Sequence, residues 1–325
     1  STYNFTVTVV PTPNYYWGIL AGSPTGATGS ANGTGTAARF FMPAGLVRDS
    51  QNNLYVGDFK NHVIRKIDPT TGLVTTFAGT MGSAGLVNGT GTAAKFNQPA
   101  GLTIDGQDNI YVADSLNHVI RKITPAGVVT TFAGTGTAGS ANGAATSATF
   151  NNPADVLINS NGVMYVADAL NNVIRKIDNG QVTTLAGLVG PGGYLDGTGS
   201  AARFNQPSYL AFTPTGNILV RDAYSNGHIR EVDPTTGVVT TFAFGTGISA
   251  QGVGVDNNGL VYAGLTGNTI SLISNFDSVV LVGTGTAGSA VGINTAATVA
   301  DPRQMVFAPN GNIYFANLNG NNIRT

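Results

Sequence analysis

One segment recurs six times along the chain, about once every fifty residues, and this repeat limits the fold more than any other feature. Its clearest copy is NIYVADSLNHVIRKI at residues 109–123. The other copies occupy residues 53–67, 163–177, 217–232, 260–273 and 312–325. Each copy has a short run of aromatic and β-branched residues, a polar turn, and a second such run. This pattern predicts a hairpin of two antiparallel strands.

An Asp ends the first strand of most copies, and an Arg follows in the second strand. The pairs are Asp58 with Arg65, Asp114 with Arg121, Asp168 with Arg175 and, across a loop one residue longer, Asp222 with Arg230. In the fifth copy Leu265 and Ser271 replace both charges, and in the sixth Asn317 faces Arg324. Removing one partner of a buried ion pair costs about 3–5 kcal/mol, whereas losing both is tolerable. We therefore interpret these residues as structural ion pairs rather than as a ring of catalytic acids.

Two further strands complete each unit, one before the hairpin and one after it. The strand after the hairpin has the pattern VVTTFAG (128–134), and the chain stops at Thr325 before the sixth hairpin can supply one. The matching segment, YWGILAG (16–22), lies at the N-terminus instead. The sequence therefore predicts an all-β, six-bladed β-propeller of four-stranded antiparallel blades. Its N-terminal strand should complete the C-terminal blade, with residues 15–22 pairing with 321–325.

The first residues differ from the repeats. STYNFTVTVV (1–10) alternates polar and apolar residues before Pro11 and Pro13, so it reads as one strand. We assign residues 1–13 to a linker or to the end strand of a preceding immunoglobulin-like module, with an extra edge strand of the main domain as the alternative. Residues 14–325 form the propeller. Gly- and Thr-rich inserts that end in an aromatic residue join most blades, but GTGIS (245–249) does not contain one.

Composition narrows the class of function. The 325 residues include no Cys, which excludes disulfides, cysteine metal sites and a thiol nucleophile. The formal net charge of −1, with 10% charged residues, argues against nucleic acid, whose affinity depends on clustered Lys and Arg. The sequence contains no run of eighteen apolar residues, so it predicts no membrane-spanning helix. Abundant Thr, Asn and Gly are typical of exported bacterial surface proteins. We therefore expect an extracellular or cell-surface monomer that is not inserted in a membrane.

Residues 97–123 carry a family resemblance. They contain the pattern NxPxG, a following Asp, a strand like GNLYVAD, and IRKI, and the inserts match DGTGxxARF. This combination resembles the NHL-repeat family, and in its inserts the bacterial extracellular members. The resemblance covers about residues 15–325 and implies a six-bladed propeller that acts as an interaction platform. It also implies that relatives bind proteins or RNA, and that related propellers include lyases and lactonases with a metal in the tunnel.

The supply of catalytic residues is small. Glu231 is the single glutamate, and His62, His118 and His228 occupy equivalent hairpin loops of three different blades. Histidines at repeat-equivalent positions indicate inherited packing, and three separate loops are too far apart to share one ion. We therefore predict no catalytic residue, no metal and no cofactor. A lyase or lactonase at the tunnel mouth is the alternative, and an RNA-binding platform is the third hypothesis.

Departures from the repeat indicate a ligand site. The residues after the blade-opening proline are Ala-Gly in two blades, whereas other blades have Asp155, Tyr209, Arg303 and Gln304 there. At a second repeat position, which is small in the other five blades, the fourth blade has Arg221. With Tyr224 at a hairpin tip, this tunnel mouth is predicted to bind a protein or glycan. In the alternative interpretation Arg221 pairs with Asp155 and fills the tunnel. A second candidate surface comprises the hairpin-tip residues Phe59, Lys60, Leu116, Leu170 and Tyr224.

The hairpin loops and the tunnel mouth should share one end of the ring, here named the hairpin end. Turns such as DPTTG (68–72) and DGQDN (105–109) mark the opposite end, named the turn end. Because the hairpin end varies between blades and the turn end is nearly uniform, we predict that ligands bind at the hairpin end.

Overall fold

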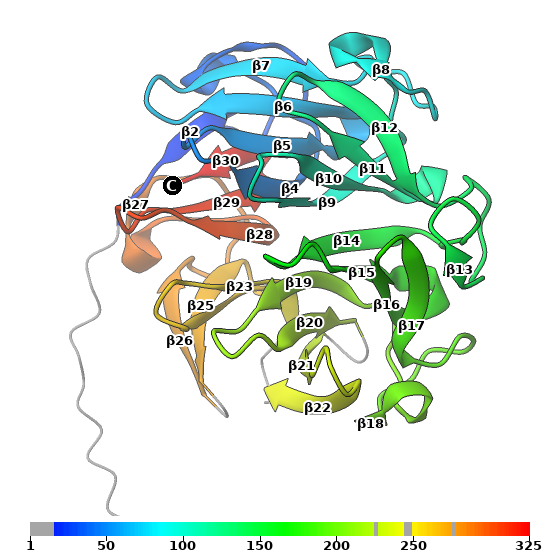
Figure 1. Ribbon diagram of the computed structural model, residues 1–325. Coiled ribbons are helices and arrows are strands. Elements are labelled where there is room, and N and C mark those ends of the chain that lie inside the picture. Colours follow the sequence, from blue (N-terminus) through cyan, green and yellow to red (C-terminus); the bar gives the residue numbers. More distant parts are fainter. Residues whose placement is uncertain (1–15, 224–226, 244–248, 275–276) are drawn as a thin grey trace, which may run out of the picture.

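The computed structural model describes residues 16–223, 227–243, 249–274 and 277–325. These residues form six antiparallel sheets of four or five strands. The innermost strands contact one another in a closed cycle around the centre, and the outermost strands lie at the rim (Figure 1). The predicted all-β, six-bladed β-propeller is confirmed. The predicted module in residues 1–13 lies outside the described residues.

Each blade runs outward from the centre in chain order. The innermost strands are β4 (Pro43–Arg48), β9 (Pro99–Ile104), β14 (Pro153–Ile158), β19 (Ser208–Phe212), β23 (Ala250–Val255) and β28 (Pro302–Phe307). The second strands are β5 (Leu54–Asp58), β10 (Ile110–Asp114), β15 (Met164–Asp168), β20 (Ile218–Asp222), β24 (Val261–Leu265) and β29 (Ile313–Asn317). The third strands are β6 (Val63–Asp68), β11 (Val119–Ile123), β16 (Val173–Asp178), β21 (His228–Val232), β25 (Thr269–Ser274) and β30 (Asn322–Arg324).

The outer strands carry an addition that the sequence did not predict. They are β7 (Leu73–Ala78), β12 (Val128–Ala133), β17 (Gln181–Gly187), β22 (Val238–Ala243), β26 (Asp277–Val282) and β2 (Ile19–Gly22). Part of the insert that precedes a blade forms a short strand along its outer edge. These short strands are β3 (Gly33–Thr34), β8 (Gly89–Thr90), β13 (Gly143–Ala144), β18 (Gly197–Thr198) and β27 (Gly292–Ile293). In the described residues the fifth blade has four strands, ending at β26, and its preceding link falls largely on residues 244–248, outside the described ranges.

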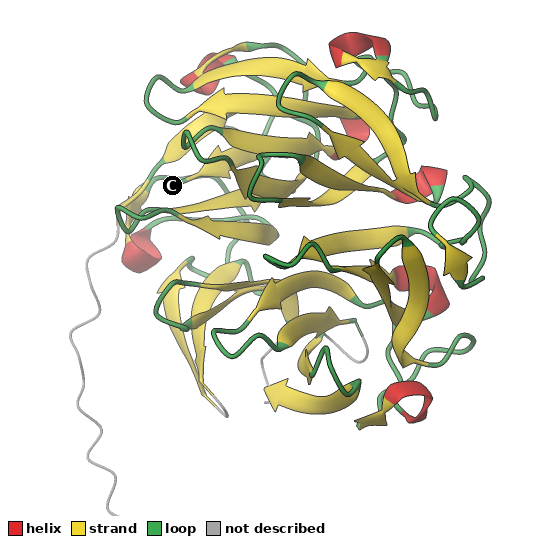
Figure 2. Ribbon diagram, in the orientation of Figure 1, coloured by secondary structure: helices red, strands yellow, loops and turns green. Residues whose placement is uncertain are grey.

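The described helices are single 3-10 turns, drawn red in Figure 2. Those in hairpin loops are η2 (Phe59–Asn61), η4 (Ser115–Asn117) and η5 (Ala169–Asn171). Those in the inserts are η1 (Gly35–Ala37), η3 (Gly91–Ala93), η6 (Gly199–Ala201) and η8 (Asn294–Ala296). Within the described ranges, none reaches the length and apolarity that a membrane crossing would need.

The N-terminal strand closes the ring as predicted. In β2, Ala21 pairs with Ile323 and Gly22 with Asn322, so the start of the propeller is the outermost strand of the blade that ends the chain. The short strand β1 (Tyr16–Trp17) extends this edge by pairing with β27. The single Trp of the chain, Trp17, is buried there. The two ends of the chain therefore hold the sixth blade together.

Apolar side chains fill the spaces between blades rather than one central core. A typical cluster joins Val47 and Tyr55 of the first blade to Phe96, Leu102 and Val112 of the second. The aromatic residue that ends an insert is fully buried in such a cluster; these residues are Phe40, Phe96, Phe150 and Phe204. Each insert therefore contributes a plug between neighbouring blades.

A side-chain hydrogen bond also connects most neighbouring blades at the hairpin end. The residue that ends each hairpin turn adopts a positive φ and accepts a hydrogen bond from a main-chain N–H of the next blade. The acceptor atoms, with donor residue and distance, are His62 Nδ1 (Gln98, 3.1 Å), His118 Nδ1 (Asn152, 3.0 Å), Asn172 Oδ1 (Gln206, 2.8 Å), Asn268 Oδ1 (Asp301, 3.3 Å) and Asn321 Oδ1 (Met42, 2.9 Å). We call these bonds the blade latches. In the fourth blade Gly227 has the positive φ, and its carbonyl accepts from the N–H of Ala250.

Candidate functional site

The predicted Asp and Arg pairs lie fully buried beneath the hairpin turns. The distances between Arg Nη1 and Asp Oδ2 are 2.8 Å for Arg65–Asp58, 3.0 Å for Arg121–Asp114, 2.9 Å for Arg175–Asp168 and 3.0 Å for Arg230–Asp222. In the second blade, Asp114 also accepts hydrogen bonds from the N–H of Asn97 and the amide of Asn117. The guanidinium of Arg121 stacks on Phe96. Each pair thus ties a hairpin to the insert in front of it.

Burial decides the charge state of these carboxylates. It raises the pKa of Asp58 and of Asp114 to about 6, against the opposing effects of the neighbouring Arg and the donated hydrogen bonds. Both side chains are therefore ionised at neutral pH. An ionised carboxylate bonded to Arg, Asn and a main-chain N–H has few free lone pairs, so this geometry suits a structural role.

The last two blades depart from the ion pair. In the fifth blade Leu265 and Ser271 are both buried, so no charge is stranded. In the sixth blade Asn317 does not bond Arg324; it donates to the side chain of Asn322 and accepts from the N–H of Ala300. The guanidinium of Arg324 instead donates to the carbonyls of Gly18, Thr298, Trp17 and Ala290. The strand register is the same as in the second blade, where Arg121 pairs with Val112 and Asp114 with Val119, so the difference lies in the side chains and not in the strand pairing.

At the tunnel mouth, one column of residues sits at a bulge in each innermost strand. In three blades it is a glycine, because the neighbouring blade approaches closely: a Cβ on Gly45 would overlap the carbonyl oxygen of Ala100. The other three blades place Asp155, Tyr209 and Gln304 there. The amide of Gln304 accepts from the N–H of Leu46 at 2.9 Å and donates to the carbonyl of Leu102 at 3.0 Å. It therefore spans from the sixth blade to the first and second.

Asp155 is buried beside Gly101 and bonds to main-chain groups. Its two oxygens accept from the N–H of Val156 at 2.8 Å and of Leu210 at 2.7 Å. Burial raises the pKa of this carboxyl to about 7, and these two hydrogen bonds oppose the shift. The interpretation in which Arg221 pairs with Asp155 is wrong, because Arg221 turns toward the fifth blade. The carboxyl bridges the third and fourth blades.

Arg221, Tyr209 and Arg303 meet around the junction of the last three blades. Arg221 donates to the carbonyl of Ala250 at 2.9 Å and to the hydroxyl of Ser208 at 3.2 Å. Arg221 thus bonds the fifth blade at the junction where Gly227 has no side chain to form a blade latch. Arg303 pairs with Asp301 at 2.6 Å and lies over the ring of Tyr209, 5.7 Å from its centroid. Tyr209 has a φ of 42°, a strained conformation for a residue with a side chain.

The structure thus brings five of the six predicted ligand residues to one mouth, where they bond to one another or to main chain. The sixth, Tyr224, lies outside the described residues. Among the described residues, no group of three His, Asp or Glu could hold a metal ion. The carboxylates at this mouth do not fit the metal of related lactonases, since Asp155 accepts two main-chain N–H groups and Asp301 is paired with Arg303.

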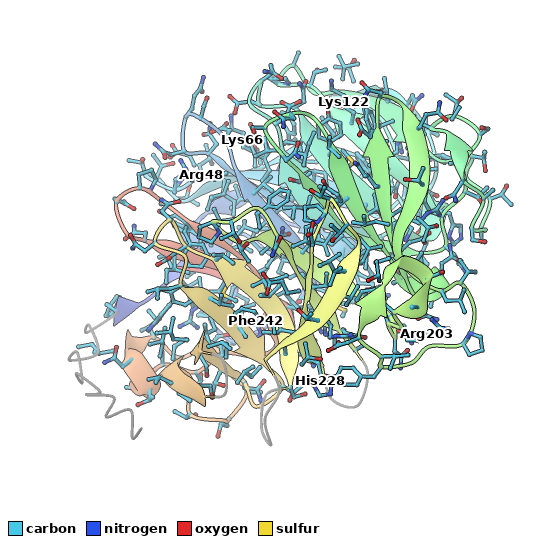
Figure 3. The ribbon with its side chains drawn as sticks, turned by 60° about the horizontal axis from the view of Figure 1, so that its bottom comes forward. Arg48, Lys66, Lys122, Arg203, His228 and Phe242 are labelled. Carbon is cyan, nitrogen blue, oxygen red and sulfur yellow. The ribbon has the colours of Figure 1, made fainter. Side chains whose placement is uncertain are left out.

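The turn end contains a cavity that the sequence did not predict. A cavity of about 350 Å³ is lined there by residues of all six innermost strands. Arg48 is the charged residue in its lining, and the sequence reasoning missed it. The signal was available: the last residue of the innermost strand is Ile104, Ile158, Phe212, Val255 or Phe307 in the other blades, so an Arg breaks the pattern. Figure 3 shows Arg48 far from His228, the residue that begins β21 at the hairpin end.

Comparison with known proteins gives the repeat type. The family model described as NHL repeat matches residues 96–123. NHL repeat-containing protein 2 of Bos taurus is 40% identical over 97 residues, 29% of this chain and 13% of that protein. The Homo sapiens protein of the same name is 35% identical over 154 residues, 43% of this chain and 21% of its own length. The matches therefore span about a fifth or less of these relatives.

Solved structures share the fold at low identity. A gluconolactonase of Xanthomonas campestris has a TM-score of 0.62 and 12% identity, covering 88% of this chain and 86% of its own. A Bacteroides thetaiotaomicron protein of unknown function has a TM-score of 0.69 and 16% identity, covering 95% and 74%. Virginiamycin B lyase of Staphylococcus aureus has a TM-score of 0.56 and 14% identity, covering 87% and 93%. Such likeness concerns the fold alone. This chain therefore carries an NHL-repeat match at residues 96–123 within a closed six-bladed β-propeller.

Proposed function

We propose that the chain is a non-enzymatic interaction module that binds a protein partner at its hairpin end, outside the cell or on its surface. The observation that carries this proposal is a row of exposed apolar tips on neighbouring blades. Leu116 is 40% exposed and Leu170 is 48% exposed, at equivalent positions of the second and third blades. Phe41, 38% exposed, lies at the same end of the first blade. Exposed apolar residues grouped on a rigid scaffold are typical of protein-binding surfaces.

The tips are held in place by the chain itself. The N–H of Leu116 donates to the carbonyl of Asn97 at 3.1 Å, and the N–H of Leu170 donates to that of Asn151 at 3.1 Å. Leu116 and Leu170 each lie within a 3-10 turn above a buried ion pair. A partner that binds them pays little entropy to order the loops. Tyr209 and Arg303 add polar groups at the same end, which supports a polar contribution to the ligand, including a glycan.

The experiment compares two charge-introducing double variants in affinity capture from extracts and culture medium of the source organism. Leu116→Asp with Leu170→Asp should lose the partner. The control, Leu73→Asp with Val128→Asp, changes side chains of similar exposure, 46% and 39%, on outer strands. It should retain the partner, and both variants should show unchanged circular dichroism. A partner kept by the tip variant and lost by the control would refute the proposal.

A further inference from the structure

The cavity at the turn end has a floor, apolar walls and one charged residue at its rim. The Gln304 amide, bonded to the first and second blades, crosses the tunnel and forms the floor. The walls include partly exposed apolar side chains from several blades: Leu157, Ala211, Phe212, Val255, Val306 and Phe307. A volume of about 350 Å³ lies within the ordinary size of small-molecule sites.

Arg48 gives this cavity its polarity. It is the last residue of β4, and its counterparts in the other blades are all apolar, so it places a single positive charge at the rim. Its Nη1 donates to the side chain of Asn52 at 2.6 Å, while its Nε is buried without a hydrogen-bond partner among the described residues. Asn52 is uncharged, and among the described residues no carboxylate pairs with Arg48, so an anionic ligand would meet no competing anion at this guanidinium.

Apolar walls select an apolar body, and the guanidinium selects an anionic group that accepts two hydrogen bonds in its plane, as a carboxylate does. We propose that the turn-end cavity binds a small organic acid, with an aromatic or branched aliphatic body inside the tunnel and a carboxylate at Arg48. This site is separate from the protein-binding surface proposed for the hairpin end. The two proposals can therefore fail independently.

The test is titration calorimetry of the whole chain with two matched probes, 3-phenylpropionate and 3-phenylpropanol. They share an apolar body and differ in the carboxylate. The unmodified protein should bind the acid at least about tenfold more tightly than the alcohol, as expected for one hydrogen-bonded charge. Arg48→Gln should remove that preference. Ala211→Phe, which fills the cavity, should abolish the binding of both.

Arg203→Gln is the matched control. Arg203 bonds to main-chain carbonyls of its own turn and lies far from Arg48 in Figure 3, so this variant should bind as the parent does. Equal affinity for acid and alcohol would overturn the role of Arg48. Binding that survives Ala211→Phe, or no heat from either probe with a folded parent, would overturn the site itself.

Discussion

The buried pair of the second blade allows a quantitative test of why the fifth blade lacks both charges. Asp114→Leu would leave Arg121 buried with only the carbonyls of Lys95 and Val87 and the side chain of Asn88 as acceptors. Arg121→Ser would leave the carboxylate without its cation. Either change should cost about 3–5 kcal/mol of unfolding free energy, because a charge loses its partner in a site with no exposure. The double variant reproduces the pair found in the fifth blade.

That double variant should cost at least about 2 kcal/mol less than the sum of the two single changes, the size of a hydrogen bond between charged groups. Urea unfolding measures each value through the fluorescence of the single Trp17, which is 2% exposed. The control cycle uses Lys176 and Asp178, a pair at 3.3 Å on the surface, where the coupling should stay below about 1 kcal/mol. If the unfolding free-energy costs of the two single changes simply add in the double variant, the argument that both charges are lost together is refuted.

Three further predictions concern the ring. Deleting residues 1–22 should lower stability and promote aggregation, because it removes β2 and leaves β30 as an unpaired edge; a truncated chain that melts like the parent would contradict the closure. His62→Asn should keep the hydrogen bond to the next blade and should reduce the loss of stability below about pH 6.5. Burial lowers the pKa of His62, and protonation removes the acceptor at Nδ1. Urea midpoints at pH 5 and pH 7.5 measure this effect, and an unchanged loss of stability in acid would count against it. The folded pKa of Asp155, about 7, exceeds its unfolded value, so this carboxyl destabilises the fold as pH rises. In urea titrations, the unfolding free energy of Asp155→Asn should therefore rise by up to about 4 kcal/mol relative to that of the parent between pH 4 and pH 8. A difference that does not change with pH would contradict this pKa.

Most of the fold follows from periodicity. Strands separated by recognisable turns, repeated six times, leave few alternatives, and the missing outer strand after Arg324 identifies its substitute at Tyr16–Gly22. The pairing of Asp114 with Arg121 follows from their placement on facing strands. The position of each blade relative to the next could not be predicted in this way. The hydrogen bond between the N–H of Gln98 and His62 joins two residues at different positions of the repeat. The type of one residue therefore does not predict the other.

The same limit of prediction from sequence applies to the candidate site. The sequence identifies Asp155, Tyr209 and Gln304 as departures from glycine, and the structure places all three in the tunnel. Whether such a residue faces solvent or a neighbouring main chain depends on the distance between blades, which local pattern does not encode. Arg221 illustrates this: it departs from a column of small residues, yet it bonds the fifth blade at Ala250 rather than Asp155.

The closure of the ring has a consequence for the order in which the protein is made. Asn322 bonds the carbonyl of Ser23 across a separation of 299 residues. A ribosome therefore produces the outer strand of the sixth blade long before the strand that receives it. Until then β2 has no partner, and bringing the two ends together costs entropy that grows with the intervening length. Blades with local contacts can form during translation, whereas closure must wait until β30 has been synthesised. Nascent chains should therefore hold an unclosed ring, sensitive to proteases at β2 until β30 has left the ribosome.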